Sequence, residues 1–166
     1  MLQLILGPMY SGKTTELFRV VERYNISKKK CTIIKYAEDT RYGHNAYTHN
    51  LQEMPAISTL NLMSVDISNY DVIGIDEGQF FPDIFEFILK NQNKIIIIAG
   101  LDGDFRREPF LNLLKLIPYA NKVKKLNAIC MKCFNKASYT KRISEEMEIK
   151  VIGGKDKYLA VCANCF

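Results

Sequence analysis

Short, uninterrupted runs of apolar residues mark the strands that this chain is expected to form. The first run, "LQLIL" at 2–6, is followed by further runs at 31–37, 70–78 and 94–105, each bounded by polar or turn-forming residues. Parallel strands that are covered on both faces have this continuous Val, Ile and Leu character. We therefore predict buried parallel strands here, and a last core strand over 121–129.

Helical spacing of apolar residues appears between these runs. Residues 14–24 carry apolar side chains at one-turn spacing, and the segment 82–91 opens with Pro82 at a helix start. A further helix is expected over 109–117, before Pro118. Because strands alternate with helices, the pattern predicts an α/β fold with a parallel, right-handed, doubly wound sheet and flanking helices.

From residue 130 onward the character of the chain changes. Strand-like segments are predicted at 137–143 and 148–154, and Cys pairs stand on either side of them. We expect two parts: a nucleotide-binding core of residues 1–128 and a small C-terminal subdomain of residues 129–166.

Composition narrows the class of protein without choosing a function. A chain of 166 residues with 48% hydrophobic content is long enough for one domain with a real core. The apolar stretch at 2–6 has no basic leader and "KIIIIAG" has only the length of a strand, so we expect no signal peptide, no membrane span and a cytoplasmic location. The net charge of +5, from 23 basic and 18 acidic residues, suits ATP as well as nucleic acid.

The motif "GPMYSGKT" matches the P-loop pattern G-x-x-x-x-G-K-[ST] and stands between a predicted strand and a predicted helix. In that setting backbone N–H groups wrap phosphate oxygens, Lys13 reaches the terminal phosphates and Thr14 ligates Mg²⁺. The alternative is a glycine turn with an exposed lysine, which this context disfavours. ATP with Mg²⁺ is the predicted cofactor, bound by Gly7, Pro8, Met9, Tyr10, Ser11, Gly12, Lys13 and Thr14.

The strand in "VIGIDEGQFF" ends in two carboxylates, Asp76 and Glu77. This is the Walker B pattern, in which Asp76 holds the Mg²⁺ and Glu77 can accept a proton from whatever attacks the γ-phosphate. Attack by water would make the protein an ATPase, and attack by a bound hydroxyl would make it a kinase. The alternative is that Asp-Glu-Gly merely ends a strand. Aromatic residues on nearby loops, Phe80, Phe81, Phe105 and Phe110, could stack on a flat base, although each alone is more often a core residue.

Four cysteines form two C-x-x-C pairs, "CMKC" and "CANC". Four thiolates at this spacing can surround a tetrahedral Zn²⁺, and the rival interpretations are two disulfides or a redox pair. The absence of a secretion signal and the unpaired Cys31 favour a reducing compartment and therefore zinc. A site filled by four cysteines leaves no open position, so the predicted metal is structural, with ligands Cys130, Cys133, Cys162 and Cys165.

The chain resembles the type II thymidine kinases, the cellular and poxvirus-like family. The resemblance rests on "GPMYSGKT", "IKYAEDTRYG", "IDEGQFFPD", "LDGDFRREPF", "CMKCFNKASYTKR", "VIGGKDKY" and "VCANC", which occur in the family's order and approximate spacing. It implies transfer of the γ-phosphoryl group of ATP to the 5′-hydroxyl of thymidine, with deoxyuridine as a second acceptor, in nucleotide salvage for DNA synthesis. It also implies a homotetramer and feedback inhibition by thymidine triphosphate.

The resemblance also implies roles for individual residues. Glu77 would be the general base and Arg41 would lie near the reacting hydroxyl and phosphates, although without the family match Arg41 would be a solvated loop residue. Phe105 resembles the aromatic residue at the base, and a lasso over the nucleoside is implied for part of the C-terminal segment. The implied nucleoside-binding set is Met9, Phe80, Leu101, Phe105, Phe110, Thr140, Ile149, Lys150, Val151, Ile152, Gly153 and Tyr158.

Two positions depart from the family pattern. Tyr10 stands where Phe is expected, so its hydroxyl needs a partner or solvent, and Asp104 adds a negative charge near the predicted base site. Lys28, Lys29 and Lys30 are expected to form a solvated turn, and His44 and His49 are given no catalytic role.

Two other classes of function compete with nucleoside kinase. A zinc-containing P-loop ATPase acting on nucleic acid would need a concentrated basic face, whereas the basic residues here are scattered along the chain. A non-catalytic nucleotide-binding scaffold would have no need for Glu77 beside Asp76. We therefore expect a small-molecule substrate and no nucleic-acid partner.

Overall fold

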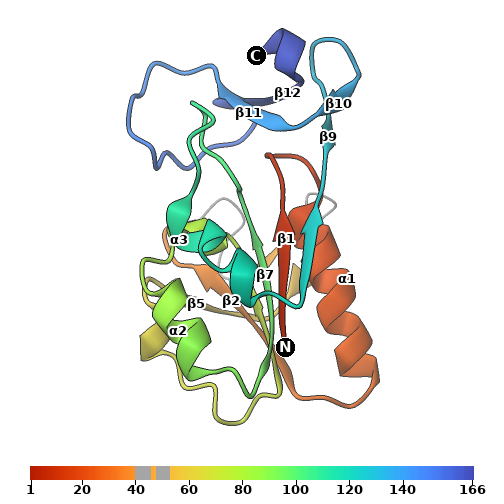
Figure 1. The fold of residues 1–166 in the computed structure, drawn as a ribbon, viewed down its shortest axis with the longest axis vertical. Helices are drawn as coiled ribbons and strands as arrows, with labels where there is room; N and C mark the ends of the chain where they lie inside the picture. The colour runs from red at the N-terminus through yellow and green to blue at the C-terminus, as the bar shows by residue number, and fades with distance from the viewer. Residues whose placement is uncertain (40–45, 48–52) are drawn as a thin grey trace.

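The computed structural model describes residues 1–39, 46–47 and 53–166. A six-stranded sheet in which every neighbouring pair is parallel forms its centre (Figure 1). The strands, in spatial order, are β5 (Ala56–Thr59), β2 (Cys31–Tyr36), β6 (Val72–Ile75), β7 (Ile95–Gly100), β1 (Leu2–Leu6) and β8 (Lys122–Lys125).

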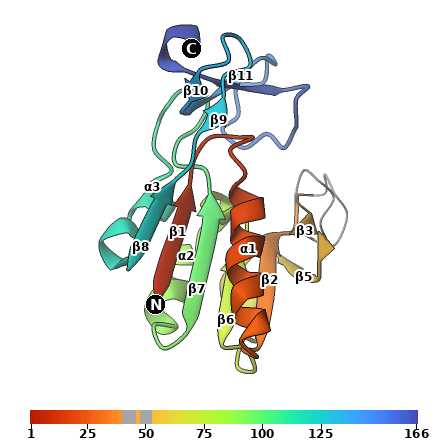
Figure 2. The same cartoon turned by 90° about the vertical axis from the view of Figure 1, so that its right-hand side faces the viewer.

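Helices cover both faces of this sheet. Helix α1 (Lys13–Ile26) lies on one face, and α2 (Ile84–Lys90) and α3 (Leu111–Leu114) lie on the other (Figures 1 and 2). Short 3₁₀ helices complete the connections: η1 (Leu62–Ser64), η2 (Gly78–Phe80), η3 (Ile117–Tyr119) and η4 (Ala163–Cys165). The predicted α/β fold with helices flanking a parallel sheet is therefore confirmed.

The alternation of side chains along β1 explains why two helical layers are needed. Ile5 belongs to the core cluster beneath α1, where it is buried with Leu17 and Val21. Leu4 and Leu6 point to the other face and join the cluster beneath α2 and α3. Because a central parallel strand is apolar on both faces, each face must be covered to remove it from water.

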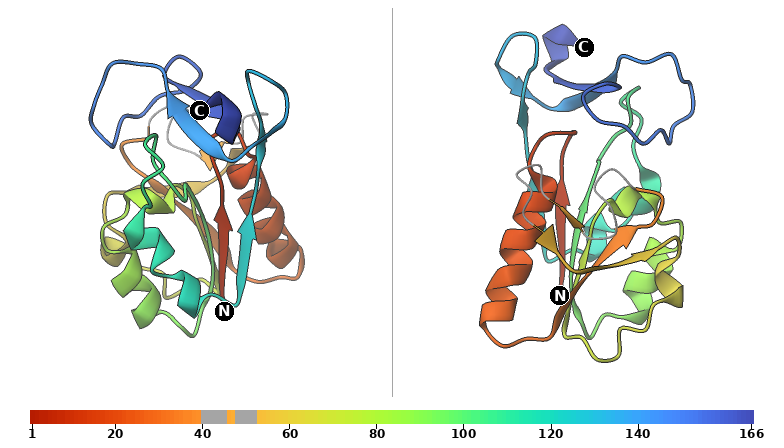
Figure 3. Two further views of the ribbon diagram at one scale, coloured as in Figure 1. Left: turned by 45° about the horizontal axis from the view of Figure 1, so that its top comes forward. Right: turned by 180° about the vertical axis from the view of Figure 1, so that it is seen from behind.

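The C-terminal segment lies across the carboxyl ends of the strands, with the C-terminus far from the N-terminus (Figures 1 and 3). Two antiparallel pairs build it, β9 with β10 and β11 with β12, while a third small pair joins β3 to β4. Their bounds are β3 (Ala46–Tyr47), β4 (Glu53–Met54), β9 (Ala128–Ile129), β10 (Lys136–Ala137), β11 (Tyr139–Arg142) and β12 (Tyr158–Val161). The carboxyl edge of the sheet and this segment therefore face each other.

Several predicted elements differ from those observed. The single strand predicted over 121–129 divides into β8, in the main sheet, and β9, which pairs with β10 instead. The helix predicted over 109–117 shortens to the single turn of α3, and the chain then tightens into η3, which contains Pro118. Proline lacks the N–H that a longer α-helix would need at that position. The edge strand β5 has the mixed sequence "AIST" and was not predicted.

The strand predicted over 148–154 is wrong. This stretch has no regular structure, and β11 pairs with β12 instead. The backbone carbonyl groups of Glu148 and Ile149 accept hydrogen bonds from the Arg142 side chain, so they are satisfied without a strand partner. Within the described residues, no helix has the length and apolarity that a bilayer span requires.

Candidate active site

The loop of residues 7–14 turns the chain sharply from β1 into α1. Gly7 has φ 152°, and a Cβ atom there would lie 2.6 Å from the backbone oxygen of Leu126. Gly12 has φ 79° and immediately precedes the first residue of α1. Only glycine adopts both conformations without strain, so the loop can turn the backbone N–H groups at the start of α1 toward one small volume.

Polar side chains of the loop turn inward. Lys13 Nζ and Ser11 Oγ each donate to the backbone oxygen of Pro8 at 2.8 Å. A lysine at the start of a helix, beside the backbone N–H groups of its first turn, is an arrangement that can bind phosphate. The predicted strand, loop and helix order is therefore present, with the geometry that phosphate binding needs.

Asp76 and Thr14 lie together at the ends of β6 and the loop. Thr14 Oγ1 lies 3.1 Å and 3.2 Å from the two carboxylate oxygens of Asp76. Removal from water, and then the negative charge of Glu77, raise the pKa of Asp76 to about 7, although the Thr14 hydrogen bond and Lys13 act in the opposite direction. A carboxylate in this environment is stabilised by a cation, and an oxygen pair of this kind suits Mg²⁺.

Glu77 is held in a strained backbone conformation. Its φ of 53° and ψ of 43° lie in the left-handed region, which costs a non-glycine residue roughly 1–2 kcal/mol. Gln79 Nε2 donates to Glu77 Oε2 at 2.7 Å, and this bond orients the carboxylate. Strain at a polar residue that lines a cavity is a feature of functional sites.

A cavity lies between the carboxyl edge of the sheet and the C-terminal segment. It brings together eleven of the twelve residues in the predicted nucleoside-binding set, together with Glu77. The members from that set are Met9, Phe80, Leu101, Phe105, Phe110, Thr140, Ile149, Val151, Ile152, Gly153 and Tyr158. Lys150 is the exception, because its side chain reaches Tyr36 and Glu38.

Asp104 also lines the cavity, but its charge is compensated locally. Its carboxylate accepts backbone hydrogen bonds from Arg106 at 2.8 Å and Glu108 at 2.9 Å, and the Arg106 guanidinium lies 3.2 Å from Oδ2. The Asp104 side chain therefore stabilises the turn that carries Phe105, and its negative charge is not free to repel an acceptor.

Arg142 is a cavity residue that the sequence analysis missed. Its guanidinium lies 3.9 Å from the Phe105 ring centre and 5.1 Å from that of Tyr158. It also donates to the backbone oxygens of Glu146, Glu148 and Ile149. Arg142 is only 8% exposed, so one buried cation orders the irregular segment that covers the cavity.

The only available sequence signal for Arg142 was its place in "SYTKRI", at an inward-facing position of a predicted strand. Three of its hydrogen bonds are to backbone carbonyl groups, and such groups leave no trace in the sequence. Gln79 was not assigned a role from the sequence, although the structure places its amide on the Glu77 carboxylate.

Hydrogen bonds tie the loop of residues 7–14 to the C-terminal segment. The Met9 backbone N–H donates to Thr140 Oγ1 at 3.0 Å, and the Tyr10 hydroxyl donates to the Tyr158 backbone oxygen at 3.4 Å. Tyr10 therefore has the partner that its hydroxyl requires. The phosphate-binding loop and the cover of the cavity are physically linked.

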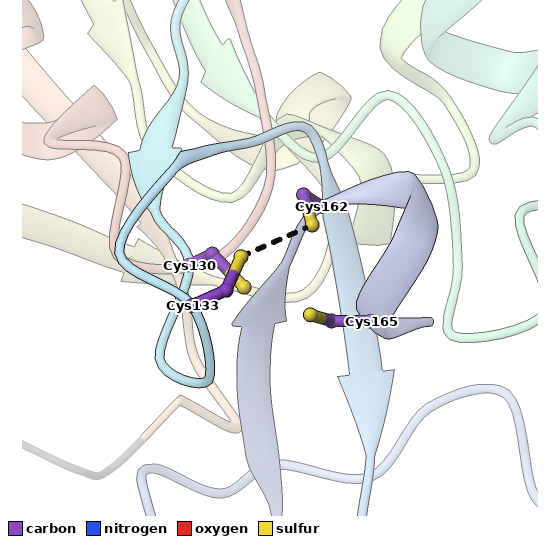
Figure 4. Close-up of side chains that lie close together, drawn as sticks. All are labelled: Cys130, Cys133, Cys162 and Cys165. Atoms are coloured by element: carbon purple, nitrogen blue, oxygen red, sulfur yellow. Dashed lines mark hydrogen bonds between the residues drawn. The ribbon is translucent and has the colours of Figure 1, made fainter.

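Four cysteine sulfurs from the two ends of the C-terminal segment lie close together (Figure 4). The Sγ atoms of Cys130, Cys133, Cys162 and Cys165 all lie within 4.8 Å of one another. A tetrahedral zinc with Zn–S bonds of about 2.3 Å places its sulfurs about 3.8 Å apart, so the four thiols fit such an ion. The site joins the turn after β9 to the turn after β12 and can hold a structural metal.

Of the predicted site residues, Arg41 lies outside the described residues. His44 and His49, which were given no role, lie outside them as well.

Comparison with known proteins places this arrangement in a family. A family model described as thymidine kinase matches residues 1–166. The thymidine kinase of sheeppox virus (strain KS-1) is 53% identical over 169 residues, which cover 99% of this chain and 96% of that protein. The thymidine kinase of vaccinia virus (strain Ankara) gives the same values, and that of monkeypox virus is 52% identical with the same coverage.

Proposed function

The chain belongs to the thymidine kinase family, and we propose that it transfers the γ-phosphoryl group of ATP to the 5′-hydroxyl of thymidine, with deoxyuridine as a second acceptor. The observation that carries this proposal is the position of Glu77, which lines the cavity beside the phosphate-binding loop and the Asp76–Thr14 pair. One carboxylate can therefore reach both a nucleoside hydroxyl and the terminal phosphate of ATP.

At the nucleotide end, backbone N–H groups of residues 7–14 would bind the β- and γ-phosphates, and Lys13 would neutralise their charge. Asp76 and Thr14 would hold the metal. Mg²⁺, when bound, supplies charge neutralisation on the transferring group. Arg41 is proposed to lie against the same phosphates, where a guanidinium would stabilise the charge that develops during transfer.

At the acceptor end, Glu77 would accept the proton of the 5′-hydroxyl as its oxygen forms a bond to the γ-phosphorus and the bond to ADP breaks. Gln79 keeps the Glu77 carboxylate pointing into the cavity. A Glu fixed in the left-handed conformation needs little reorganisation at the moment of transfer, and such preorganisation lowers the barrier.

The base of the nucleoside would lie among the aromatic side chains and the backbone of residues 149–153. Backbone N–H and C=O groups can read the edge of a pyrimidine, because each offers one donor or acceptor at a fixed position. Arg142 and Tyr158 hold that backbone: the Tyr158 hydroxyl donates to the Val151 oxygen at 2.7 Å and accepts from Arg142 at 2.6 Å.

We further propose that residues 129–166 form a lid on a core of residues 1–128, and that Zn²⁺ joins both ends of the lid. Four cysteine sulfurs within 4.8 Å of one another support this role. A segment with so small an apolar cluster gains much of its folding free energy from the metal.

Homotetramer formation, cytoplasmic location and feedback inhibition by thymidine triphosphate stay predictions, the second from the absence of a targeting segment in the sequence and the other two from the family resemblance. Light scattering on the purified protein, with and without ATP, tests the first of them. Inhibition of initial rates by thymidine triphosphate, at several thymidine concentrations, tests the third.

An assay with ATP and Mg²⁺ tests the central proposal. Thymidine, deoxyuridine, deoxycytidine and single-stranded DNA are offered in parallel while ADP and the labelled acceptor are followed. We expect thymidine monophosphate to form in step with ADP. ADP release that depends on DNA, without a phosphorylated nucleoside, would reject the kinase proposal and favour a nucleic-acid-dependent ATPase.

A further inference from the structure

The Lys150 side chain leaves the lid and contacts the core at the end of β2. Its Nζ atom forms an ion pair with Glu38 and a hydrogen bond with the Tyr36 hydroxyl. The same atom lies 4.1 Å from the centre of the Tyr36 ring. Three interactions from one ammonium group therefore connect the lid to a strand that is more than a hundred residues away in sequence.

The core side of this contact packs against a residue that lines the cavity. Tyr36 is only 6% exposed, and its ring packs against Phe80 at 5.5 Å and Phe81 at 5.3 Å. Phe80 lines the cavity, and Lys150 lies 5.8 Å from its ring centre. A lid held against Tyr36 is therefore placed relative to the residues that would contact the nucleoside.

An exposed ion pair alone contributes little to stability, because water screens both charges. Here the Lys150 and Glu38 side chains are 37% and 53% exposed, so the pair by itself falls in that class. Unlike a simple exposed ion pair, Lys150 also lies over the ring of Tyr36, which is buried in the core. The hydrogen bond from Lys150 lowers the pKa of Glu38. Partial burial acts to lower the pKa of Lys150, but the hydrogen bonds and charges of Glu38 and Tyr36 together have the larger effect and raise it.

The lid segment that immediately precedes Lys150 is held by Arg142. Arg142 binds the backbone oxygens of Glu146, Glu148 and Ile149, all from within the lid itself. Lys150 follows directly and is joined to the core. The backbone of residues 151–153, which lines the cavity, begins at this attachment.

We propose that Lys150 is a positioning residue for the nucleoside, which it serves by fastening the lid to Glu38 and Tyr36. The inference rests on the proposed function, because it concerns the acceptor of that reaction. Its side chain contacts the core and is not among the residues that line the cavity. Its loss is expected to weaken nucleoside binding while the phosphate-transfer machinery, built by the loop of residues 7–14, Asp76 and Glu77, stays intact.

The first test compares Lys150→Met with Lys155→Met. Lys155 lies on the same lid and is exposed, so both variants lose one lid lysine. We expect Lys150→Met to raise the KM and the calorimetric Kd for thymidine roughly three- to tenfold, with kcat and the KM for ATP within twofold of wild type. Lys155→Met should match the wild type. Equal effects of the two variants, or an equal rise for ATP, would overturn the proposal.

Charge reversal provides the sharper test. Glu38→Lys and Lys150→Glu should each raise the thymidine KM, and the double variant should return it to within about threefold of wild type, because the ion pair is then restored in the opposite sense. A thymidine KM of the double variant that is raised by the product of the two single-variant factors would show that the pair does not fasten the lid. Zinc content and melting temperature show whether each variant is folded.

Amide hydrogen exchange separates this inference from the proposed function. Residues 148–154 should exchange faster in Lys150→Met than in Lys155→Met, whether or not the protein phosphorylates thymidine. Unchanged exchange would reject the attachment itself. A wild-type protein that forms no thymidine monophosphate, yet shows this difference in exchange, would reject the kinase proposal and leave the attachment standing.

Discussion

The side-chain amide of Gln79 connects Glu77 to the next strand of the sheet. Its Nε2 donates to Glu77 Oε2 at 2.7 Å, and its Oε1 accepts from the Leu101 backbone N–H at 3.0 Å. Gln79 is 4% exposed, so both hydrogen bonds are shielded from water. The carboxylate of the proposed general base, which follows β6, is therefore held relative to the end of β7 through Gln79.

Replacement of Gln79 by Met keeps the volume of the side chain and removes both hydrogen bonds. We expect kcat to fall at least tenfold while the KM values for ATP and thymidine change less than threefold, because the Glu77 carboxylate is present but no longer oriented. Loss of a partner for Leu101 N–H should also lower the free energy of unfolding by about 1–3 kcal/mol.

Gln92→Met is a matched control for this variant. Gln92 is exposed, and within the described residues its Nε2 donates only to the Leu89 backbone oxygen, at 3.2 Å. Steady-state kinetics on both variants distinguish the roles: a loss confined to KM in Gln79→Met would contradict an orienting role.

Glu77→Gln removes the proposed base without changing its size. Turnover should fall by roughly 10²- to 10⁴-fold, the range for a lost general base, while calorimetric binding of ATP and thymidine is retained. Turnover near the wild-type rate would exclude Glu77 from proton transfer. Impaired thymidine binding of the same magnitude as the loss of turnover would instead make it a binding residue.

Arg142→Lys keeps the positive charge of the cation that orders the lid. A lysine ammonium is a compact group with three donors and no planar face, whereas the guanidinium has five donors in a fixed fork, so a lysine is not expected to bind all three lid carbonyl groups and stack on Phe105 together. We expect a thymidine KM about tenfold higher, with the KM for ATP little changed. Equal loss for the two substrates, measured by steady-state kinetics, would show that Arg142 supports the whole fold.

Zinc removal should affect the two substrates unequally. The four cysteines join the ends of the lid, whereas the loop of residues 7–14 belongs to the core, so chelation or Cys162→Ser should weaken thymidine binding more than ATP binding. Cys31→Ser is the control, because Cys31 lies on β2 at a distance from this cluster. Calorimetric titrations with both substrates, alongside metal analysis, check the expectation. Equal loss of both affinities would mean that the metal maintains the core.

An ion-pair cluster on α1 predicts a defined pH dependence of stability. Glu16 lies 2.8 Å from Arg19 and 2.8 Å from Lys124 of β8, and the hydrogen bond from Arg19, with a smaller effect of Lys124, lowers the pKa of Glu16 to about 2. Because this folded-state pKa lies below the ordinary value of 4.5, the stabilising contribution of Glu16 is present above about pH 4.5 and is lost as the pH falls toward 2.

Glu16→Gln should therefore lower the free energy of unfolding by about 1 kcal/mol at pH 7, since both cations are partly exposed. The difference from wild type should shrink as the pH falls below about 4.5. Glu86→Gln is the control, because its pair with Lys90 is exposed on both sides and should contribute almost nothing. Denaturant titrations of the three proteins across this pH range check the sign.

Local motifs allowed much of the core to be predicted. The sequence between Leu2 and Thr14 contains a strand, a glycine loop and a helix start in immediate succession, and each is specified by neighbouring residues. The same holds for Asp76 at the end of β6 and for the two C-x-x-C pairs, whose ligands converge as predicted. These features depend on short-range geometry, which a linear pattern records well.

Features that depend on distant backbone groups could not be predicted in this way. The stretch 148–154 alternates like a strand, yet the Arg142 guanidinium binds its carbonyl groups and β12 takes the place beside β11. The role of Gln79 depends on the Leu101 backbone N–H, which comes from the end of the next strand and donates to the Gln79 side chain. The contact of Lys150 with Tyr36 and Glu38 spans more than a hundred residues.

The sequence by itself determined the groups on which the proposed chemistry rests: a loop proposed to bind phosphates, carboxylates proposed as metal ligand and base, and four thiols that can hold zinc. Those groups are side chains and short motifs, and their identity is written directly in the residues. The tertiary structure decided how a nucleoside could be enclosed, because the lid is positioned by backbone carbonyl groups and by pairs such as Lys150 with Glu38. Every residue carries the same backbone groups, so only the folded chain shows which of them meet.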